Sequence, residues 1–182
     1  MNSFYTEEEL KTLGLKKVGE DVSISRKCSI YSPENIIIGN HTRIDDFCIL
    51  SGTITIKDHV HIAAFSAIYG GEEGVYIDDY ANISSRVSIY SISDDYSGET
   101  MTNPTIPAEY KNVKSAPVKI EKHVIIGATS VVLPGVTLKE GSAFGSFSFI
   151  NKDSLPWSIN AGIPCEYKKE RSKKLLENIF ED

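Results

Sequence analysis

Residues 36–68, IIIGNHTRIDDFCILSGTITIKDHVHIAAFSAI, carry an aliphatic side chain at every sixth position from Ile38 to Ile68. Four residues after most of these positions lies a small or β-branched residue, such as Cys48 or Val60. A period of six fits neither the 3.6-residue turn of an α-helix nor the alternation of a long strand. The pattern indicates short strands joined by tight corners.

The same spacing continues on both sides of this stretch, with two short slips and one long interruption. Eighteen positions share it: Val18, Ile24, Ile30, Ile38, Ile44, Leu50, Ile56, Ile62, Ile68, Ile77, Ile83, Ile89, Ile120, Ile126, Val132, Leu138, Phe144 and Ile150. If three hexads close one triangular coil, stacked coils bury these side chains in a continuous core. The sequence therefore predicts an all-β fold, a parallel β-helix of about six coils. The alternative is a β-sandwich, but its turns would not preserve a six-residue spacing.

The hexads, with IGNHTRI (38–44), IIGATSVVLPGVTL (125–138) and NAGIPCEYKK (160–169), resemble the hexapeptide-repeat acyltransferases over residues 18 to about 170. The resemblance implies that the β-helix is left-handed, whereas the general preference for right-handed crossovers would give the opposite hand. It also implies a homotrimer with active sites between subunits and acetyl-CoA as the acyl donor.

Both ends of the chain carry helical patterns. Thr6 and Glu9 have the spacing of a capping box, which predicts a short helix that covers the open end of the first coil. The stretch KKERSKKLLENIFED (168–182) has apolar residues at helical spacing, namely Leu175, Leu176 and Ile179. This spacing predicts a C-terminal helix.

The expected organisation has three parts. Residues 1–17 form an N-terminal helical cap, residues 18–155 form the β-helix with a loop inserted at 95–119, and residues 156–182 form a C-terminal turn and helix.

Composition excludes several classes of protein. The formal net charge of −6 argues against a nucleic-acid partner and against a polybasic lipid anchor. No apolar stretch approaches the roughly 20 residues that span a bilayer, and the acidic N-terminus does not read as a signal peptide. Three cysteines without paired spacing suggest neither a disulfide framework nor a metal site. We expect a cytoplasmic protein without stable membrane insertion.

The longest departure from the repeat lies between Ile89 and Ile120, where thirty residues replace the usual five. The inserted twenty-five residues, 95–119, are polar and rich in turn formers, and long loops on regular scaffolds are usually functional. A brace between subunits is the alternative role. In the resembling sugar acetyltransferases, a histidine just before such a loop acts as general base. The matching position here is Asp94, and the loop contains no histidine.

We therefore take Asp94 and His61 as candidate catalytic residues. A general base typically contributes ~10²–10⁴-fold when a hydroxyl is the nucleophile, whereas a neutral amine needs it less. Asp94 could equally anchor the acceptor or cap a turn, and a surface role is the alternative for His61. Asp95, Tyr96 and Glu99 are candidate acceptor-binding residues, although Asp95 also suits a purely structural role.

The resemblance also implies donor-binding positions. Small corner residues would let the pantetheine arm approach the backbone, and lysines near the C-terminus would pair with phosphates. The positions are Gly127, Ala128, Gly145, Ser146, Asn151, Lys152, Lys168 and Lys169. The alternatives are that the glycines only form tight corners and that the lysines are solvated.

The motifs HIAAFSAIYGG (61–71) and NPTIPAEYKNV (103–113) resemble a subgroup associated with surface-polysaccharide and O-antigen biosynthesis. The expected function is an acetyl-CoA-dependent acetyltransferase that modifies a hydroxyl of a saccharide or nucleotide-linked sugar. One alternative is N-acetylation of a nucleotide-linked amino sugar, and another is a non-catalytic β-helix scaffold. A zinc hydratase would need three converging histidines, a spacing that is missing, so no metal is expected.

Overall fold

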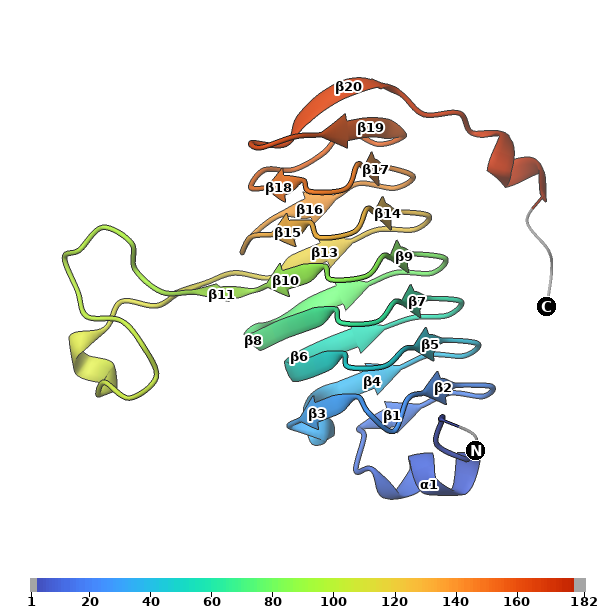
Figure 1. Ribbon diagram of the computed structural model, residues 1–182, viewed down its shortest axis with the longest axis horizontal. Coiled ribbons are helices and arrows are strands. Elements are labelled where there is room, and N and C mark those ends of the chain that lie inside the picture. Colours follow the sequence, from blue (N-terminus) through green and yellow to red (C-terminus); the bar gives the residue numbers. More distant parts are fainter. Residues whose placement is uncertain (1–2, 179–182) are drawn as a thin grey trace.

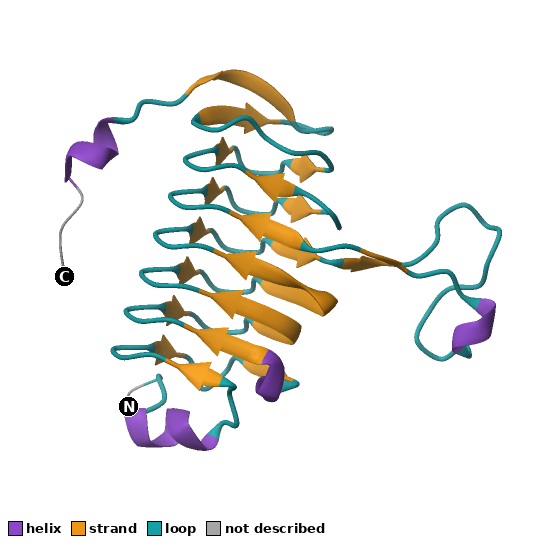
Figure 2. Ribbon diagram, turned by 180° about the vertical axis from the view of Figure 1, so that it is seen from behind, coloured by secondary structure: helices purple, strands orange, loops and turns teal. Residues whose placement is uncertain are grey.

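The computed structural model of the chain describes residues 3–178 and consists of triangular coils stacked along one axis (Figures 1 and 2). The fold is the expected left-handed parallel β-helix. Backbone hydrogen bonds join each strand to the strand directly above it, and a short tight corner follows each strand. Each coil therefore contributes one strand to each of three faces.

The faces are numbered in chain order. The first face contains β1 (Lys17–Val18), β4 (Ile36–Ile38), the second halves of β6 (Ile49–Ile56) and β8 (Ala67–Ile77), β13 (Val118–Ile120) and β16 (Thr137–Leu138). The second face contains β2 (Ser23–Ile24), β5 (Arg43–Ile44), β7 (His61–Ile62), β9 (Asn82–Ile83), β14 (Ile125–Ile126), β17 (Ala143–Phe144) and β19 (Ser158–Ala161). The third face contains β3 (Ser29–Tyr31), the first halves of β6 and β8, β10 (Ser88–Tyr90), β15 (Val131–Val132) and β18 (Phe149–Ile150).

The eighteen hexad positions point inward and stack in register, as Ile24, Ile44 and Ile62 do on the second face. Sixteen of them are buried, and the other two, Val18 and Ile30, lie in the first coil and pack against this core. The predicted core is confirmed. Burying β-branched side chains on a pleated surface is the main stabilising contribution that this geometry offers.

The first corner, between the first and second faces, carries a ladder of stacked rings. His41, His59, Tyr80 and His123 follow one another on consecutive coils with ring centroids 4.8–5.1 Å apart. Their backbones have positive φ, which the corner requires. In the next coil the position is Gly141, where a Cβ would lie 2.4 Å from the ring of Trp157 above.

The coil count is slightly higher than predicted. A seventh, partial coil follows the six predicted ones, because β19 pairs with β17 and places Asn160 directly above Phe144. Asn160 is buried, and its side-chain amide donates to the Ser158 hydroxyl over 2.8 Å. A polar residue in the aliphatic position hid this coil from the hexad pattern.

The predicted C-terminal helix is wrong over much of its length. Residues 166–170 form β20 (Glu166–Glu170), which pairs antiparallel with β19, and within the described residues a short 3₁₀-helix, η3 (Lys174–Asn178), follows. Strand pairing prevails because β19 would otherwise leave an open sheet edge at the top of the solenoid. Arg171 then donates from Nη1 to the carbonyl oxygens of His123 and Gly141. Ile179, part of the predicted helix, lies outside the described residues.

The N-terminal cap is confirmed. The helix α1 (Glu7–Thr12) begins with the predicted capping box, in which Thr6 and Glu9 exchange hydrogen bonds. Leu10 turns inward and is 3% exposed, so the helix closes the bottom of the core (Figure 1). No helix in the described part of the chain is long and apolar enough to cross a bilayer.

The long insertion forms an arm that projects away from the solenoid at the third corner (Figures 1 and 2). Its base is a two-stranded ribbon, β11 (Ile92–Ser93) paired antiparallel with β12 (Lys114–Ser115), and its tip contains the 3₁₀-helix η2 (Ala108–Tyr110). The shorter insertions, including the 3₁₀-helix η1 (Pro33–Asn35), lie at the same corner. Insertions therefore leave the other two corners regular.

The ring ladder predicts a pH dependence of stability. Burial lowers the pKa of His123 below its usual 6.5, so the unfolded chain binds a proton at a pH where the folded chain does not. The free energy of unfolding should therefore fall as the pH drops below 6.5. In His123→Phe, which retains a stacking ring, the loss of melting temperature between about pH 7.5 and about pH 5.5 should be smaller than in the wild type. Equal losses in thermal unfolding of the two proteins would contradict this.

Candidate active site

A groove runs along the third face where the arm leaves the solenoid. It consists of two adjoining hollows of about 780 and 660 Å³. Both hollows are lined by Ser93, Asp94 and Tyr96 from the arm and by Leu133 and Phe149 from the upper coils. We call these two hollows the arm groove. Its lower end reaches a stacked tyrosine pair, Tyr69 and Tyr90, and its upper end reaches Asn151.

Asp94 lies directly after β11 and is exposed in both hollows. Within residues 3–178 its carboxylate accepts no hydrogen bond and makes no ion pair, and only its backbone carbonyl is bonded, by the Ser93 hydroxyl. The side chain therefore does not cap a turn. Of the three roles considered for Asp94, general base and acceptor anchor both fit this geometry.

Asp95 has the opposite environment. Only 7% exposed, it accepts hydrogen bonds from the Ser97 backbone and hydroxyl, both 2.9 Å, and from the Thr100 hydroxyl at 2.7 Å. These bonds, led by that from the Ser97 backbone, lower the pKa of Asp95 to about 2. The geometry favours the structural role for Asp95, as the residue that holds the first turn of the arm.

The other two acceptor-binding candidates differ in position. Tyr96 is 91% exposed and lines both hollows of the arm groove. Glu99 is exposed on the next turn, where its backbone N–H donates to the Ser97 hydroxyl, and it does not line the groove. Their roles stay predictions.

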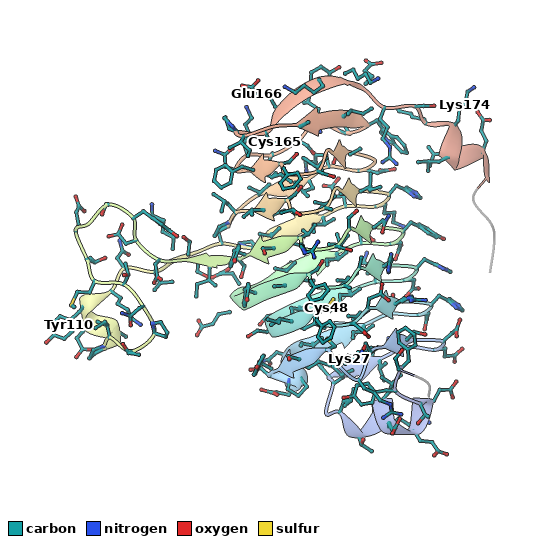
Figure 3. All side chains as sticks on the ribbon, viewed as in Figure 1. Lys27, Cys48, Tyr110, Cys165, Glu166 and Lys174 are labelled. Carbon is teal, nitrogen blue, oxygen red and sulfur yellow. The ribbon has the colours of Figure 1, made fainter. Side chains whose placement is uncertain are left out.

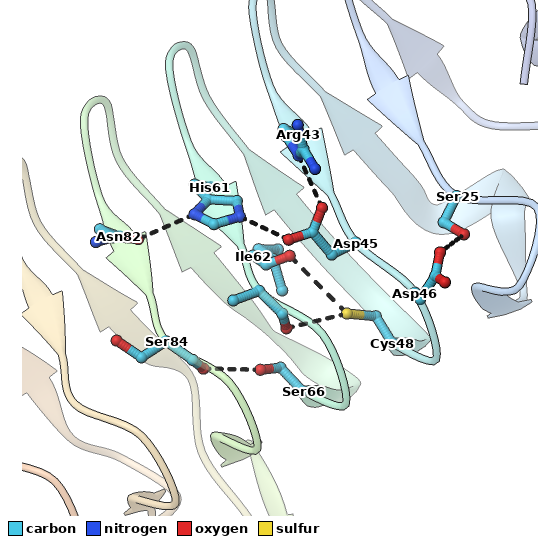
Figure 4. A network of polar contacts seen from close by, with 11 residues as sticks. Ser25, Arg43, Asp45, Asp46, Cys48, His61, Ile62, Ser66, Asn82 and Ser84 are labelled. Carbon is cyan, nitrogen blue, oxygen red and sulfur yellow. Dashed lines mark hydrogen bonds and ion pairs between the residues drawn. The ribbon is translucent and has the colours of Figure 1, made fainter. Parts of the chain in front are cut away.

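His61 lies in β7 on the second face, whereas the arm leaves the third corner. Figure 4 shows its polar contacts. Its Nε2 is 2.9 Å from Asp45 Oδ2 and its Nδ1 is 3.3 Å from Asn82 Oδ1. Burial raises the pKa of Asp45, but hydrogen bonds from His61 and Arg43 outweigh it and leave that pKa below its usual value. Both ring nitrogens of His61 are thus occupied, and within one chain the structure does not bring His61 to Asp94.

The predicted donor glycines form a column on the second corner, between the second and third faces. Gly127 and Gly145 follow β14 and β17, and a Cβ on Gly127 would lie 2.5 Å from the Ser146 backbone nitrogen. The close stacking of coils therefore requires this glycine even without a ligand. Because the two glycines have no side chains, they also leave a strip of uncovered backbone, here called the glycine strip, which includes Ala128 and Ser146.

Ser84 lies one coil below Gly127 in the same column, because its backbone N–H donates to Ile126 O over 3.0 Å. Ser84 points outward, whereas the hexad repeat marks inward positions, so the repeat did not single it out. The signal that could have identified Ser84 was its position in the same column as the two glycines, in the coil that carries the arm.

Most of the predicted basic positions gather at the top of the solenoid. Figure 3 shows Cys165 in this region. Burial, the largest effect, raises the pKa of the Cys165 thiol, although the charges of Lys168 and Lys152 lower it in part. Lys169 extends from β20 opposite Ile159. Lys152, Lys168 and Lys169 are exposed and make no ion pair with the described part of the chain. Within that part no group of three His, Cys, Asp or Glu residues could hold a metal ion.

Two parts of the site lie apart in one chain. Ser84 and the glycine strip are on the second corner, whereas Asp94 follows β11, past the third corner, at the end of the groove along the third face. The strand β10 and its flanking corner residues separate them.

Comparison with known proteins gives close relatives, although no family model matches the chain. The chain is 53% identical over 178 residues to the dTDP-4-amino-4,6-dideoxy-D-glucose acyltransferase of Escherichia coli, which covers 96% of this chain and 92% of that protein. The hexapeptide-repeat acetyltransferase VCA0836 of Vibrio cholerae, solved with acetyl-CoA, is 21% identical over 92% of this chain and 79% of that chain, with a TM-score of 0.60. At this identity it shows the fold alone.

A second close relative has been solved with ligands. AntD, an N-acyltransferase from Bacillus cereus in complex with dTDP and 3-hydroxybutyryl-CoA, is 51% identical with a TM-score of 0.96, over 98% of this chain and 95% of that chain. The S84A variant of AntD was solved with dTDP-4-amino-4,6-dideoxyglucose and coenzyme A, and the D94A variant with dTDP and coenzyme A.

The bonds of Asp95 predict how the arm responds to mutation. Asp95→Asn removes the charge that the Ser97 and Thr100 donors face, so the arm should open locally more often. Limited proteolysis should then cut within residues 95–115 faster than in the wild type, while the melting temperature of the solenoid changes little. Glu99→Gln, which disturbs no side-chain bond, is the matched control. Equal cleavage rates for Asp95→Asn and the wild type would refute this role.

Proposed function

The chain belongs to the hexapeptide-repeat family of nucleotide-sugar acyltransferases, and from that membership we propose that it acylates the 4-amino group of dTDP-4-amino-4,6-dideoxyglucose. It is a CoA-dependent acyltransferase that acts on a sugar. The observation that carries the proposal is the 53% identity to a dTDP-4-amino-4,6-dideoxy-D-glucose acyltransferase over nearly the whole chain.

An amine acceptor corresponds to the alternative rather than to the leading expectation from the sequence, which was a hydroxyl. The chemistry agrees with the arm, which lacks a histidine. A neutral amine attacks a thioester without prior deprotonation and loses its proton afterwards, so a carboxylate suffices as proton acceptor. Asp94, whose carboxylate makes no bond within residues 3–178, suits that role.

In the proposed reaction the amine nitrogen attacks the thioester carbonyl, and a tetrahedral intermediate forms. The C–S bond then breaks, the amide remains on the sugar, and the amine proton passes through Asp94 to the departing thiolate. The Ser84 hydroxyl can donate a hydrogen bond to the negative charge on the intermediate. AntD variants altered at its residues 84 and 94 support this pair, because this chain carries Ser84 and Asp94 at the same numbers.

The assembly that we propose is a homotrimer in which the arm of one subunit reaches the second corner of the next. Such a cleft would unite Asp94 with Ser84, which one chain holds apart. The pantetheine arm would follow the backbone at Gly127 and Gly145, and Lys152, Lys168 and Lys169 would pair with phosphates of the coenzyme. Because the three cysteines are free and a CoA thioester and a nucleotide sugar are its substrates, we place the enzyme in the cytoplasm.

The acceptor can be tested directly by thiol release. With acetyl-CoA or 3-hydroxybutyryl-CoA, the enzyme should turn over dTDP-4-amino-4,6-dideoxyglucose and leave dTDP-6-deoxyglucose, which has a hydroxyl at the same carbon, unmodified. Turnover of the hydroxyl compound alone would restore O-acylation and refute the proposal.

The shared site predicts complementation between inactive variants. Asp94→Asn and Ser84→Ala should each lower kcat at least about tenfold, whereas Lys173→Ala, on the first corner beside Trp157, should not. In randomly mixed trimers of the two variants, about a quarter of the clefts carry both intact residues, so coexpression should restore activity. Sedimentation would confirm the trimer. Absence of recovery in mixed trimers would show that the two residues do not meet across subunits.

A further inference from the structure

An exposed aromatic pair lies on the second corner below Ser84. Phe47 and Phe65 stack with centroids 4.9 Å apart, and the guanidinium of Arg86 lies 5.5 Å from the centre of the Phe65 ring. The two rings are 49% and 53% exposed. Large exposed aromatics that are grouped together often mark a binding surface.

This aromatic pair lies lower on the same corner as the glycine strip of Gly127 and Gly145. Ala63 lies one coil below Ser84, because its N–H donates to Ile83 O, and Arg86 donates from its backbone to Ala64 O over 3.2 Å. The two alanines keep the path from Ser84 to Phe65 open, since neither projects beyond a methyl group. Arg86 is two residues from Ser84, so their Cα atoms are at most about 7.6 Å apart, a span that a pyranose ring bridges.

The charge of Arg86 is available to a ligand. The neighbouring carboxylate Asp46 is already occupied, since it accepts from the Ser25 hydroxyl and from Lys27 Nζ, at 2.5 and 2.8 Å. Asp45 is held by Arg43 and His61 (Figure 4). The Arg86 side chain makes no ion pair with any residue between 3 and 178, and its only partner there is the Phe65 ring. A guanidinium next to an aromatic face can bind a diphosphate in bidentate fashion.

We propose that Arg86 and Phe65 form the nucleotide subsite of the acceptor, in which Arg86 pairs with the diphosphate of the nucleotide sugar and the Phe65 ring packs against its nucleoside. This inference rests on the proposed function. The donor then enters along Gly127 and Gly145 from above, the acceptor occupies the same corner from below, and the two meet at Ser84.

Steady-state kinetics with each substrate varied in turn tests this assignment. Arg86→Ala should raise KM for dTDP-4-amino-4,6-dideoxyglucose at least about tenfold while KM for the acyl-CoA changes less than about twofold. Arg86→Lys keeps the charge but not the forked guanidinium, so its KM for that substrate should lie between those of the wild type and Arg86→Ala. Phe65→Leu should also raise the KM for dTDP-4-amino-4,6-dideoxyglucose. Lys173→Ala, which removes a cation 5.8 Å from the ring of Trp157 on the first corner, is the matched control and should change neither KM.

Calorimetry with dTDP alone and with coenzyme A alone separates the subsite from the proposed function. The wild type should bind dTDP, Arg86→Ala should bind it at least about tenfold more weakly, and both should bind coenzyme A alike. An acceptor KM that Arg86→Ala leaves unchanged, or a loss of coenzyme A affinity instead, would overturn the subsite. If the wild type binds dTDP in this way but does not acylate the amino sugar, the proposed function fails and the nucleotide subsite stands.

Discussion

Parallel backbone pairing between successive coils is the constraint on which the rest of this molecule depends. Because every strand bonds to the strand one coil above, each position of the hexad becomes a vertical column. One column of aliphatic residues is the core. Another is the ring ladder that ends at Trp157, and a third is the strip of Ser84, Gly127 and Gly145. The repeat therefore determines both the stability of the fold and which side chains line up along each corner.

The same constraint explains where the chain departs from regularity. Inserted residues must leave and rejoin the coil without shifting the pairing, and all the long insertions do so at the third corner. After the arm, Ile120 still pairs with Ile77, so the solenoid continues in register. The arm can therefore leave the third corner, with Asp94 at its base, while the coils at the second corner stay in register.

The sequence predicted the core, the N-terminal cap and the arm because each leaves a local periodic or capping signal. It did not predict the seventh coil, because Asn160 replaces an aliphatic residue there. It also did not predict β20, because the charged sequence of that strand resembles a helix. Within the proposed site, the sequence selected Asp94 as a candidate from its place directly before the arm. The sequence did not select Ser84, because outward residues of a repeat look alike in sequence and the role proposed for Ser84 involves a second chain.

The stacking of coils also sets the distances between positions along the second corner. From Ser84 through Gly127 and Gly145 to Ala161 the second corner rises by three coils, which at about 4.8 Å each is about 14 Å. In the proposed site, this height fixes how far the reacting thioester lies from the terminal lysines. If the pantetheine arm follows this corner as proposed, the number of coils between Ser84 and the lysines sets the length of arm that can join them.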